Sequence, residues 1–440
     1  MAHAKLLPVY FESPDNKEFV EKLANLEKLL EQEAKFLDPI SIQEIDEKHT
    51  ADAVVFPRII GDIYKKYSYL QNIELPILIL TSQFGTMAMW DWEIVSYLKE
   101  KGIEVYAPYE LDTAHILCRA LSLKREMKDT SFVVYQDDPG DGMQSSIFKR
   151  FFWWENECKQ NIEDTFGIDI IKKSYKSLGE KAKNIRDKEA KKIISEREIK
   201  TENLPEKNLL SAVKLYLQLK KEIEENGNVG AVGTNCLNES YFSDTTPCLA
   251  WDLLYKDREM VWGCEADLLI MITKYIVYKV LQSPIIMSNI YPFLMGEAAL
   301  RHERINSFPD IKEPENCILV AHCGYLGVVP EPFAEQWTLK PGVLEIVEDN
   351  SVAIDARLPK GDVTFSKLNS SLNKLFALEG SLEGYVQYPD SDCKNGAVIR
   401  VEDGRELMEK VFSHHNCILT GQKKHELKIL SRIFNLKLIP

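Results

Sequence analysis

Hydrophobic and polar positions in the N-terminal part of the chain follow two alternating periods. Residues 6–13 form a short apolar run that predicts a strand, and residues 17–37 repeat apolar side chains at helical spacing. Further β-rich runs, separated by helical or polar stretches, lie at 51–59, 75–83, 103–111 and 131–136. Apolar strands between amphipathic helices are typical of a parallel sheet covered on both faces. No G-x-G-x-x-G motif follows the first strand, so the dinucleotide-binding fingerprint is absent.

A second α/β segment begins near residue 166, and its charged stretch 172–207 predicts a solvated helical pair. It ends in the sequence VWGCEADLLIMITKYIV, residues 261–277, where Asp267 can cap a strongly apolar helix. Glu265 then lies just outside that helix, on a turn that contains glycine. A carboxylate in such a place is either solvated at a loop tip or directed at a group that needs it.

After about residue 282, short strands with turn signals every 8 to 12 residues predict an antiparallel barrel or sandwich. A helix at 423–435 and a short strand at 436–440 end the chain. We therefore predict an α/β protein with two parallel-sheet, Rossmann-like domains and a mostly β C-terminal barrel domain. The predicted ranges are 1–163 for the N-terminal domain, 164–281 for the middle domain and 282–440 for the C-terminal domain.

Composition limits the class of protein and its partners. The hydrophobic fraction of 45% and the charged fraction of 28% are ordinary for a soluble globular protein. The net charge of −14 disfavours nucleic acid and anionic membranes, which need a basic face. No apolar run approaches the roughly 20 residues that span a bilayer. Nine cysteines without a CxxC pair, and a start that lacks a signal-peptide pattern, favour a cytoplasmic protein with reduced thiols.

Three groups at predicted element ends could hold a divalent metal ion. Of the eight histidines, His3, His49 and His425 lie in polar contexts typical of a surface. His322 follows a predicted strand, and the pair His414–His415 lies between a helix and an apolar run. Each of these histidines, taken alone, can equally be a packed or hydrogen-bonded ring. Together with Glu265 they form a plausible ligand set for a metal that polarises sugar oxygens during aldose–ketose isomerisation.

Four segments, in this order, resemble the L-fucose and L-arabinose isomerases. Residues 78–92 are similar to a first-domain loop around a substrate-facing Gln, and 167–190 to the entry of the second domain. Residues 233–268 resemble the segment that ends in the metal-binding Glu, and 414–439 the C-terminal segment with the metal-binding His. The resemblance runs from about residue 50 to the end. It implies a divalent cofactor, most simply Mn²⁺ with Co²⁺ as an alternative.

Carried over residue by residue, the resemblance makes Glu265 and His415 metal ligands. The second carboxylate of the family falls on Asn289, whose amide oxygen can bind a cation but cannot accept a proton at neutral pH. His322 is a candidate third ligand, as an additional His is in the arabinose branch. Cys264 and Cys323 flank these positions and are most simply small buried side chains.

Glu265 is also assigned to catalysis, and further residues are assigned to catalysis and to the substrate. Glu297, Arg301 and His302 follow Asn289 closely; they either form an exposed helical charge pair or replace the missing carboxylate. Residues expected to bind the substrate are Gln83, Trp90, Asp91 and Asn235. In the resembled family the first-domain loop reaches a neighbouring subunit's site, which implies a homo-oligomer, a trimer or hexamer with shared active sites. The alternative for Trp90 and Trp92 is simple packing at the sheet edge.

The sequence therefore predicts a metal-dependent aldose–ketose isomerase-like enzyme. Its substrate would be a sugar or modified sugar, bound in a cleft between the middle and C-terminal domains. The alternatives are a divergent carbohydrate epimerase or lyase that uses the same cleft, and a non-catalytic sugar-binding relative. Asn289 favours the alternatives, whereas the contexts of Glu265 and His415 favour an active metal site.

Overall fold

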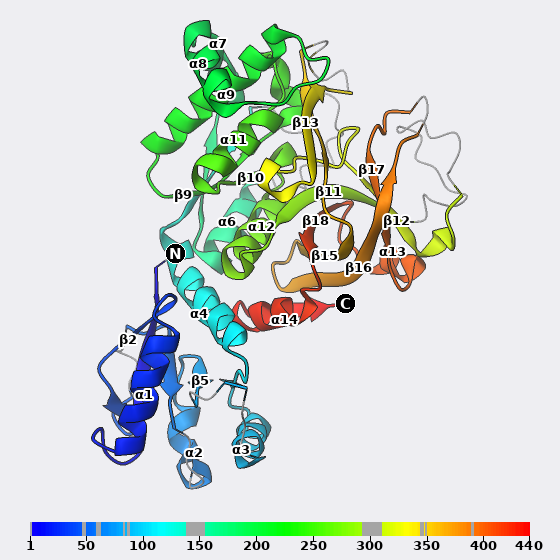
Figure 1. The fold of residues 1–440 in the computed structure, drawn as a ribbon. Coiled ribbons are helices and arrows are strands. Elements are labelled where there is room, and N and C mark those ends of the chain that lie inside the picture. The colour runs from blue at the N-terminus through cyan, green and yellow to red at the C-terminus, as the bar shows by residue number, and fades with distance from the viewer. Residues whose placement is uncertain are drawn as a thin grey trace. The chain divides into compact units, whose positions relative to one another are not determined.

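The computed structural model forms two compact units (Figure 1). It describes residues 2–45, 50–58, 63–81, 84–85, 89–137, 155–292, 310–343, 347, 350–388 and 391–440, without the side chains of Tyr64, Met89, Trp90, Pro292 and Met408. The first unit comprises Met1–Glu126, Lys279–Leu281 and Lys428–Asn435. The second comprises Met127–Tyr278, Gln282–Leu427 and Leu436–Pro440.

The first unit is built on a parallel sheet with the strand order β2-β1-β4-β5-β6 and β3 paired to β1. Its strands are β1 (Ala4–Tyr10), β2 (Ala34–Phe36), β3 (Ile40–Ser41), β4 (Ala53–Phe56), β5 (Ile77–Ile79) and β6 (Val105–Tyr106). Its helices are α1 (Lys17–Leu29), α2 (Ile63–Gln71), α3 (Met89–Glu100) and α4 (Leu111–Glu126). Asn16 caps α1 by accepting the Phe19 N–H, as expected for a residue of this type.

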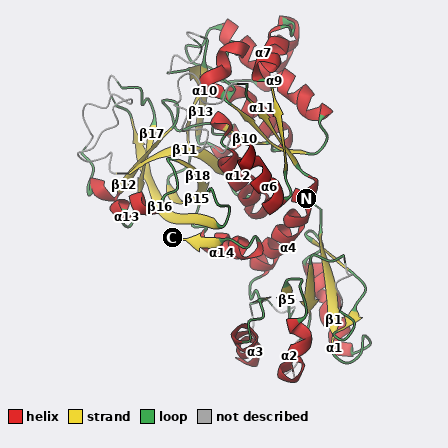
Figure 2. Cartoon of the chain, turned by 180° about the vertical axis from the view of Figure 1, so that it is seen from behind, coloured by secondary structure: helices red, strands yellow, loops and turns green. Residues whose placement is uncertain are grey.

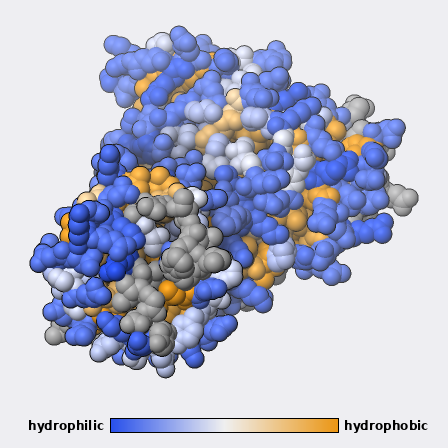
Figure 3. Space-filling view, turned by 60° about the horizontal axis from the view of Figure 1, so that its bottom comes forward, coloured by the Kyte–Doolittle hydropathy of each residue, from blue (hydrophilic) through white to orange (hydrophobic). Residues whose placement is uncertain are grey.

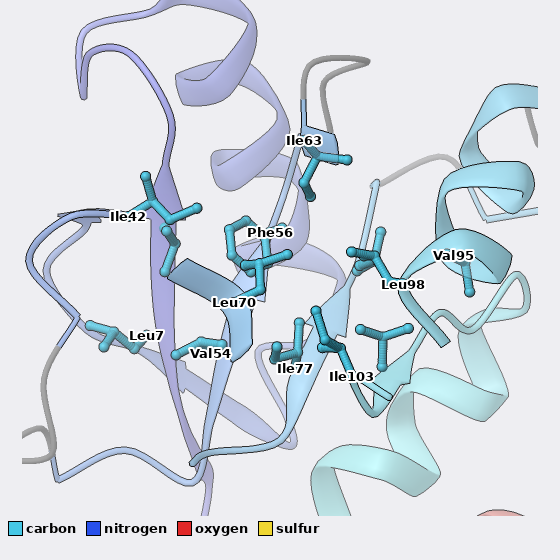
Figure 4. Packing of buried hydrophobic residues seen from close by; sticks show 13 residues of the cluster. Leu7, Ile42, Val54, Phe56, Ile63, Leu70, Ile77, Val95, Leu98 and Ile103 are labelled. Carbon is cyan, nitrogen blue, oxygen red and sulfur yellow. The ribbon is translucent and has the colours of Figure 1, made fainter. Parts of the chain in front are cut away.

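One apolar cluster stabilises this sheet from the side of α2 and α3 (Figure 4). The strands contribute residues such as Val54 and Phe56, while Leu70 comes from α2 and Leu98 from α3, each at most 1% exposed. Burial of such side chains contributes roughly 1.5–3 kcal/mol each. The packing of helices against the sheet therefore accounts for the apolar character of the strands predicted from the sequence.

The second unit begins with a four-stranded parallel sheet of order β10-β9-β7-β8. Its strands are β7 (Ser131–Tyr135), β8 (Asp169–Lys173), β9 (Val229–Thr234) and β10 (Val261–Gly263). The helices of this part are α6 (Asn156–Phe166), α7 (Tyr175–Lys183), α8 (Asp187–Arg197), α9 (Glu206–Glu225), α10 (Cys236–Glu239), α11 (Cys248–Arg258) and α12 (Leu268–Leu281). The predicted helical pair in the charged stretch is confirmed by α7 and α8. Strand β7 pairs in this sheet, although the predicted range 1–163 placed it with the N-terminal strands.

A closed antiparallel barrel of six strands follows, with the ring order β15-β18-β11-β12-β17-β16 and β16 paired back to β15 (Figures 1 and 2). Its strands are β11 (Ile285–Pro292), β12 (Cys317–Ala321), β15 (Gly361–Leu368), β16 (Lys374–Val386), β17 (Gly396–Arg400) and β18 (His415–Thr420). The remaining elements are the β13–β14 hairpin (Gln336–Pro341 and Val352–Arg357), α13 (Gly404–Lys410), α14 (Lys424–Ile433) and β19 (Lys437–Ile439), which pairs parallel to β16.

Helix α12 packs against both the parallel sheet and the barrel of the second unit. The Tyr275 ring meets Phe132 of β7 edge-on, with ring centroids 5.2 Å apart. On the barrel side, the Thr273 hydroxyl accepts the Leu368 N–H of β15 at 3.0 Å. A helix in contact with structure on two sides must be apolar around most of its circumference. The unusual composition of residues 268–281 follows from this position, which also places the start of α12 beside the barrel strands.

The coarse fold prediction is confirmed: an α/β protein with two parallel sheets and a C-terminal antiparallel barrel. The face drawn in Figure 3 is mostly hydrophilic, with scattered hydrophobic groups, as is usual for a protein surface. Among the described residues, no helix combines the length and the apolar character needed to cross a membrane.

Candidate metal centre

Glu265 lies on a tight turn between β10 and α12. The 3-10 turn Cys264–Ala266 has left-handed backbone angles at Glu265 (φ 54°) and at Ala266 (φ 53°). Non-glycine residues adopt this conformation at a cost of about 1–3 kcal/mol, and such strain clusters at functional sites. Gly263 permits the close approach of α12, since a Cβ there would be 2.4 Å from the Met271 Cγ. The turn buries Glu265 to 5% exposure rather than leaving it at a loop tip.

His322 and His415 come from neighbouring parts of the barrel wall. His322 directly follows β12, and His415 is the first residue of β18; both strands pair with β11. Cys323, which follows His322, also has a left-handed backbone (φ 53°). Both imidazoles are buried, with His415 at 0% exposure and His322 at 5%. Strand pairing thus sets the two rings at the ends of the two strands that flank β11.

The structure brings Glu265, His322 and His415 into one buried cluster. The Glu265 Oε1 lies 3.3 Å from the His322 Nε2 and 3.5 Å from the His415 Nε2. One ligand atom from each of the three residues lies within 4.8 Å of the other two. Ligand atoms that share one ion at about 2.0–2.2 Å lie roughly 2.8–3.6 Å apart for octahedral or tetrahedral angles. The two distances from the Glu265 carboxylate to the imidazoles therefore suit a common metal ion.

A buried ion pair orients His415. The Asp267 Oδ1 accepts the Ile270 N–H at 3.0 Å and so caps α12, as predicted from the sequence. Its Oδ2 lies 2.9 Å from the His415 Nδ1 and accepts a hydrogen bond from the Lys367 Nζ at 3.1 Å. A carboxylate on the Nδ1 of a histidine fixes the ring tautomer and leaves the Nε2 for a metal. The Lys367 Nζ also donates to the Ser413 Oγ at 2.7 Å, which anchors it beside β18.

The charges of the cluster are strongly coupled. Burial opposes the ionisation of Glu265, but His415 and His322 outweigh it and hold the pKa of Glu265 well below its ordinary value. Burial likewise opposes the charge on His415, yet Glu265 and Asp267 raise the pKa of His415 above its ordinary value. Against burial, Lys367 and then His415 lower the pKa of Asp267 to about 2. The second ring of the pair behaves oppositely, since burial and the charge on His415 lower the pKa of His414 to about 3.

Asn289 lies directly opposite His415 in the β11–β18 ladder and opposite Ala321 in the β11–β12 ladder. Directly opposed residues of antiparallel strands place their side chains on the same face. The Asn289 Nδ2 donates to the Tyr291 hydroxyl at 2.8 Å. Its Oδ1 is buried and makes no hydrogen bond within the described part of the chain. Asn289 is therefore a neighbour of the cluster with an acceptor oxygen to offer.

The donor set fits a divalent cation. One carboxylate and two imidazoles are ligands common to Mn²⁺, Fe²⁺, Co²⁺ and Zn²⁺ sites that keep open positions. The His322 Nε2 is buried, and like the Asn289 Oδ1 it makes no hydrogen bond to any described residue. Buried polar atoms in native proteins are nearly always satisfied, and a bound ion would satisfy these. The cluster could thus hold a metal ion, whose identity these residues do not fix.

Of the other predicted site residues, some lie in the described part of the chain and the others outside it. Asn235 is fully buried after β9, and its Nδ2 donates to the Glu239 Oε1 at 2.9 Å. Asp91 lies in the first turn of α3, in the first unit. Predicted residues outside the described ranges are Gln83, Glu297, Arg301 and His302, and the side chain of Trp90 is also not described. His3 and His425 are exposed, as expected for surface residues, and His49 lies outside the described residues.

Sequence reasoning missed the roles of Asp267 and Lys367 beside His415. Asp267 was predicted only as a helix cap, and no local pattern links it to a histidine 148 residues away. No protein-family model matches the chain, and a search of curated proteins gives no match. The residues of the cluster must therefore carry the functional argument.

Proposed function

We propose that the protein is a metal-dependent enzyme of the aldose–ketose isomerase type that acts on a free or modified sugar. The buried Glu265–His322–His415 cluster carries this proposal, because its atoms have metal-ligand spacing. The resemblance to the L-fucose and L-arabinose isomerases supports the reaction class and Mn²⁺ or Co²⁺ as the metal. It also suggests Rossmann-like parallel-sheet domains.

Each residue near the cluster has a role in this proposal. Glu265, His322 and His415 would hold the ion, which when bound polarises the neighbouring carbonyl and hydroxyl oxygens of the sugar. Asp267 fixes His415 with its Nε2 toward the ion, and Lys367 keeps Asp267 ionised. Burial excludes water and strengthens these electrostatic interactions. The proton that moves between C1 and C2 of the sugar requires a base, for which Glu297 and His302 remain the predicted candidates.

Asn289 favours a second candidate reaction. It lies opposite His415, where the resembled isomerases have a carboxylate that binds the metal and can take part in proton transfer. A neutral amide can still ligate through its oxygen, but it cannot accept the proton. Epimerase or lyase chemistry on a carbohydrate needs the same polarised oxygens with a different base. A sugar-binding protein without turnover is the third outcome.

The shared active site of the resembled family has support in the first unit. Trp92 and Tyr109 are 52% and 38% exposed, and large exposed aromatic side chains are common at interfaces and on sugar-binding surfaces. We propose a homo-oligomer in which the segment around Asp91 completes a neighbouring subunit's site.

Metal analysis followed by a sugar panel tests the proposal. Purified protein loaded with Mn²⁺ or Co²⁺ is incubated with free aldoses and ketoses in D₂O, and NMR detects both isomerisation and deuterium exchange at C2. The Glu265→Gln variant should lose at least about tenfold in metal affinity, because it removes the charged ligand. Glu259→Gln, an exposed carboxylate of the same segment, is the matched control. Equal metal content in Glu265→Gln and wild type would refute the assignment, and exchange without isomerisation would favour the epimerase or lyase alternative.

A further inference from the structure

A narrow cavity adjoins the metal cluster on the side of His322. Its wall contains four cysteines that come from four separate segments, namely Cys236, Cys248, Cys264 and Cys323. His322 belongs to both the cavity wall and the metal cluster. The cavity volume is about 30 Å³. A cavity needs roughly 10–15 Å³ of such volume to hold one water molecule, so this cavity has room for a group of a few heavy atoms.

The four cysteines give this wall a soft, weakly polar surface. Cys236 and Cys264 are buried, and Cys248 and Cys323 are partly buried. None of the four belongs to the metal cluster found among the described residues. A free cysteine in such a place behaves as a small, polarisable, hydrophobic group. These cysteines therefore provide an apolar surface beside the metal rather than extra ligands.

The rest of the cavity wall is also mainly apolar. Val328, Val352 and Ile354 contribute aliphatic side chains. Thr246 has its hydroxyl engaged with the backbone of Val352. Trp251 is fully buried on this wall, and its indole ring adds further apolar surface.

We infer that this cavity is the subsite for a compact apolar end of the molecule that binds at the metal cluster. The ligand class is a small chelating compound whose metal-binding oxygens continue into an alkyl group of a few carbons. The inference rests on the proposed metal site, because His322 belongs both to that site and to the cavity wall.

Alkyl hydroxamates of increasing length test this subsite. The hydroxamate group chelates a metal ion with open positions, and its tail reports the space next to that ion. Acetohydroxamate, propionohydroxamate and butyrohydroxamate are titrated by calorimetry into Mn²⁺-loaded protein. Each CH₂ that enters the cavity should tighten binding about fourfold. The gain should end when the cavity is full.

Two variants should change the dependence of hydroxamate affinity on tail length in opposite directions. Cys248→Leu narrows the cavity and should abolish the gain from the longer tails, whereas Ile354→Ala widens it and should extend the gain to butyrohydroxamate. Mn²⁺ and acetohydroxamate should bind both variants as they bind wild type, which controls for folding. Failure of wild type to bind Mn²⁺ would overturn both the metal site and the subsite. Mn²⁺ binding with affinity independent of tail length, or with the same dependence in all three proteins, would overturn the subsite alone.

Discussion

Replacing Asp267 by Asn tests how the metal centre is organised. The cap of α12 survives the change, because the amide oxygen can still accept the Ile270 N–H. The NH₂ group then faces the His415 Nδ1 and the Lys367 Nζ, where the carboxylate Oδ2 accepted two hydrogen bonds. The His415 Nδ1 must now accept, so its ring proton moves to the Nε2, the atom that faces Glu265. Lys367 is left as a buried ammonium without its anion.

The structure allows both effects to be given a size. Loss of the partner that orients a metal-ligating histidine reduces metal affinity by roughly 10–100-fold. The side chains of Asp267 and Lys367 are 0% and 1% exposed, so little water reaches the remaining charge. Removing one partner of such a buried pair costs about 3–5 kcal/mol of unfolding free energy. Asp267→Asn should therefore weaken metal binding and destabilise the fold together.

A double variant separates these two effects. Urea unfolding measures the free energy, and calorimetry with Mn²⁺ measures the affinity. Asp267→Asn with Lys367→Met removes the stranded charge and should recover most of the stability, while the affinity stays low because His415 is still misoriented. Wild-type Mn²⁺ affinity in Asp267→Asn would refute the orienting role. Unchanged stability of that single variant would refute the buried ion pair.

Three other predictions concern the charge, the proton balance and the assembly of the site. Asn289→Asp should raise Mn²⁺ affinity by adding an anion opposite His415; unchanged binding in a titration of the metal-free variant would place residue 289 outside the metal shell. In metal-free protein, the lowered pKa of Glu265 stabilises the fold fully at pH values above 4.5, the ordinary pKa of a glutamate. The raised pKa of His415 stabilises the fold fully at pH values below 6.5, the ordinary pKa of a histidine. The Glu265 contribution is lost as the pH falls through the pKa of Glu265, and the His415 contribution is lost as the pH rises through the pKa of His415. Because Mn²⁺ must displace the proton on His415, it should bind more tightly with rising pH and release a proton. Calorimetry in two buffers measures this proton release. Light scattering should find a homo-oligomer that Trp92→Ala weakens, and a fully active monomer would contradict the shared site.

The period of the hydrophobic pattern predicted most of the helices and strands, because each element sets its own period within its own residues. Helix 423–435 and strand 436–440 correspond to α14 and β19. Pairing is a different matter, since β7 reads as one more apolar strand of the N-terminal series but pairs with β8 and β9. In β16, Lys374, Glu379 and Gly380 interrupt the apolar alternation typical of a barrel strand. The barrel accepts them because β16 pairs along its length with β15 and β17.

The sequence also predicted the residue types of the centre, but not their support. Glu265, His322 and His415 stood out because each is a polar residue at the end of an apolar element. Their distances depend on where the turn before α12 meets the barrel, which no local pattern encodes. Lys367 reads as an ordinary outward-facing residue of a strand, and only the closed barrel places it against Asp267. Roles that depend on charge pairing over long sequence separations were therefore not predictable.

The charges around the cluster connect Asn289 to the reaction. Glu265 and Asp267 carry two negative charges, and Lys367 carries one positive charge in the same buried region. In metal-free protein a proton on His415 would bring these groups to neutrality, which agrees with its raised pKa. A divalent ion that displaces this proton leaves one net positive charge, because Asn289 does not contribute the anion that a carboxylate would. Such a centre attracts a substrate that supplies the missing negative charge itself, as an ionised hydroxyl or a carboxylate. Asn289→Asp should then weaken the binding of an anionic ligand while it strengthens the binding of the metal, and this opposition distinguishes a substrate-completed centre from an isomerase that has only lost a ligand.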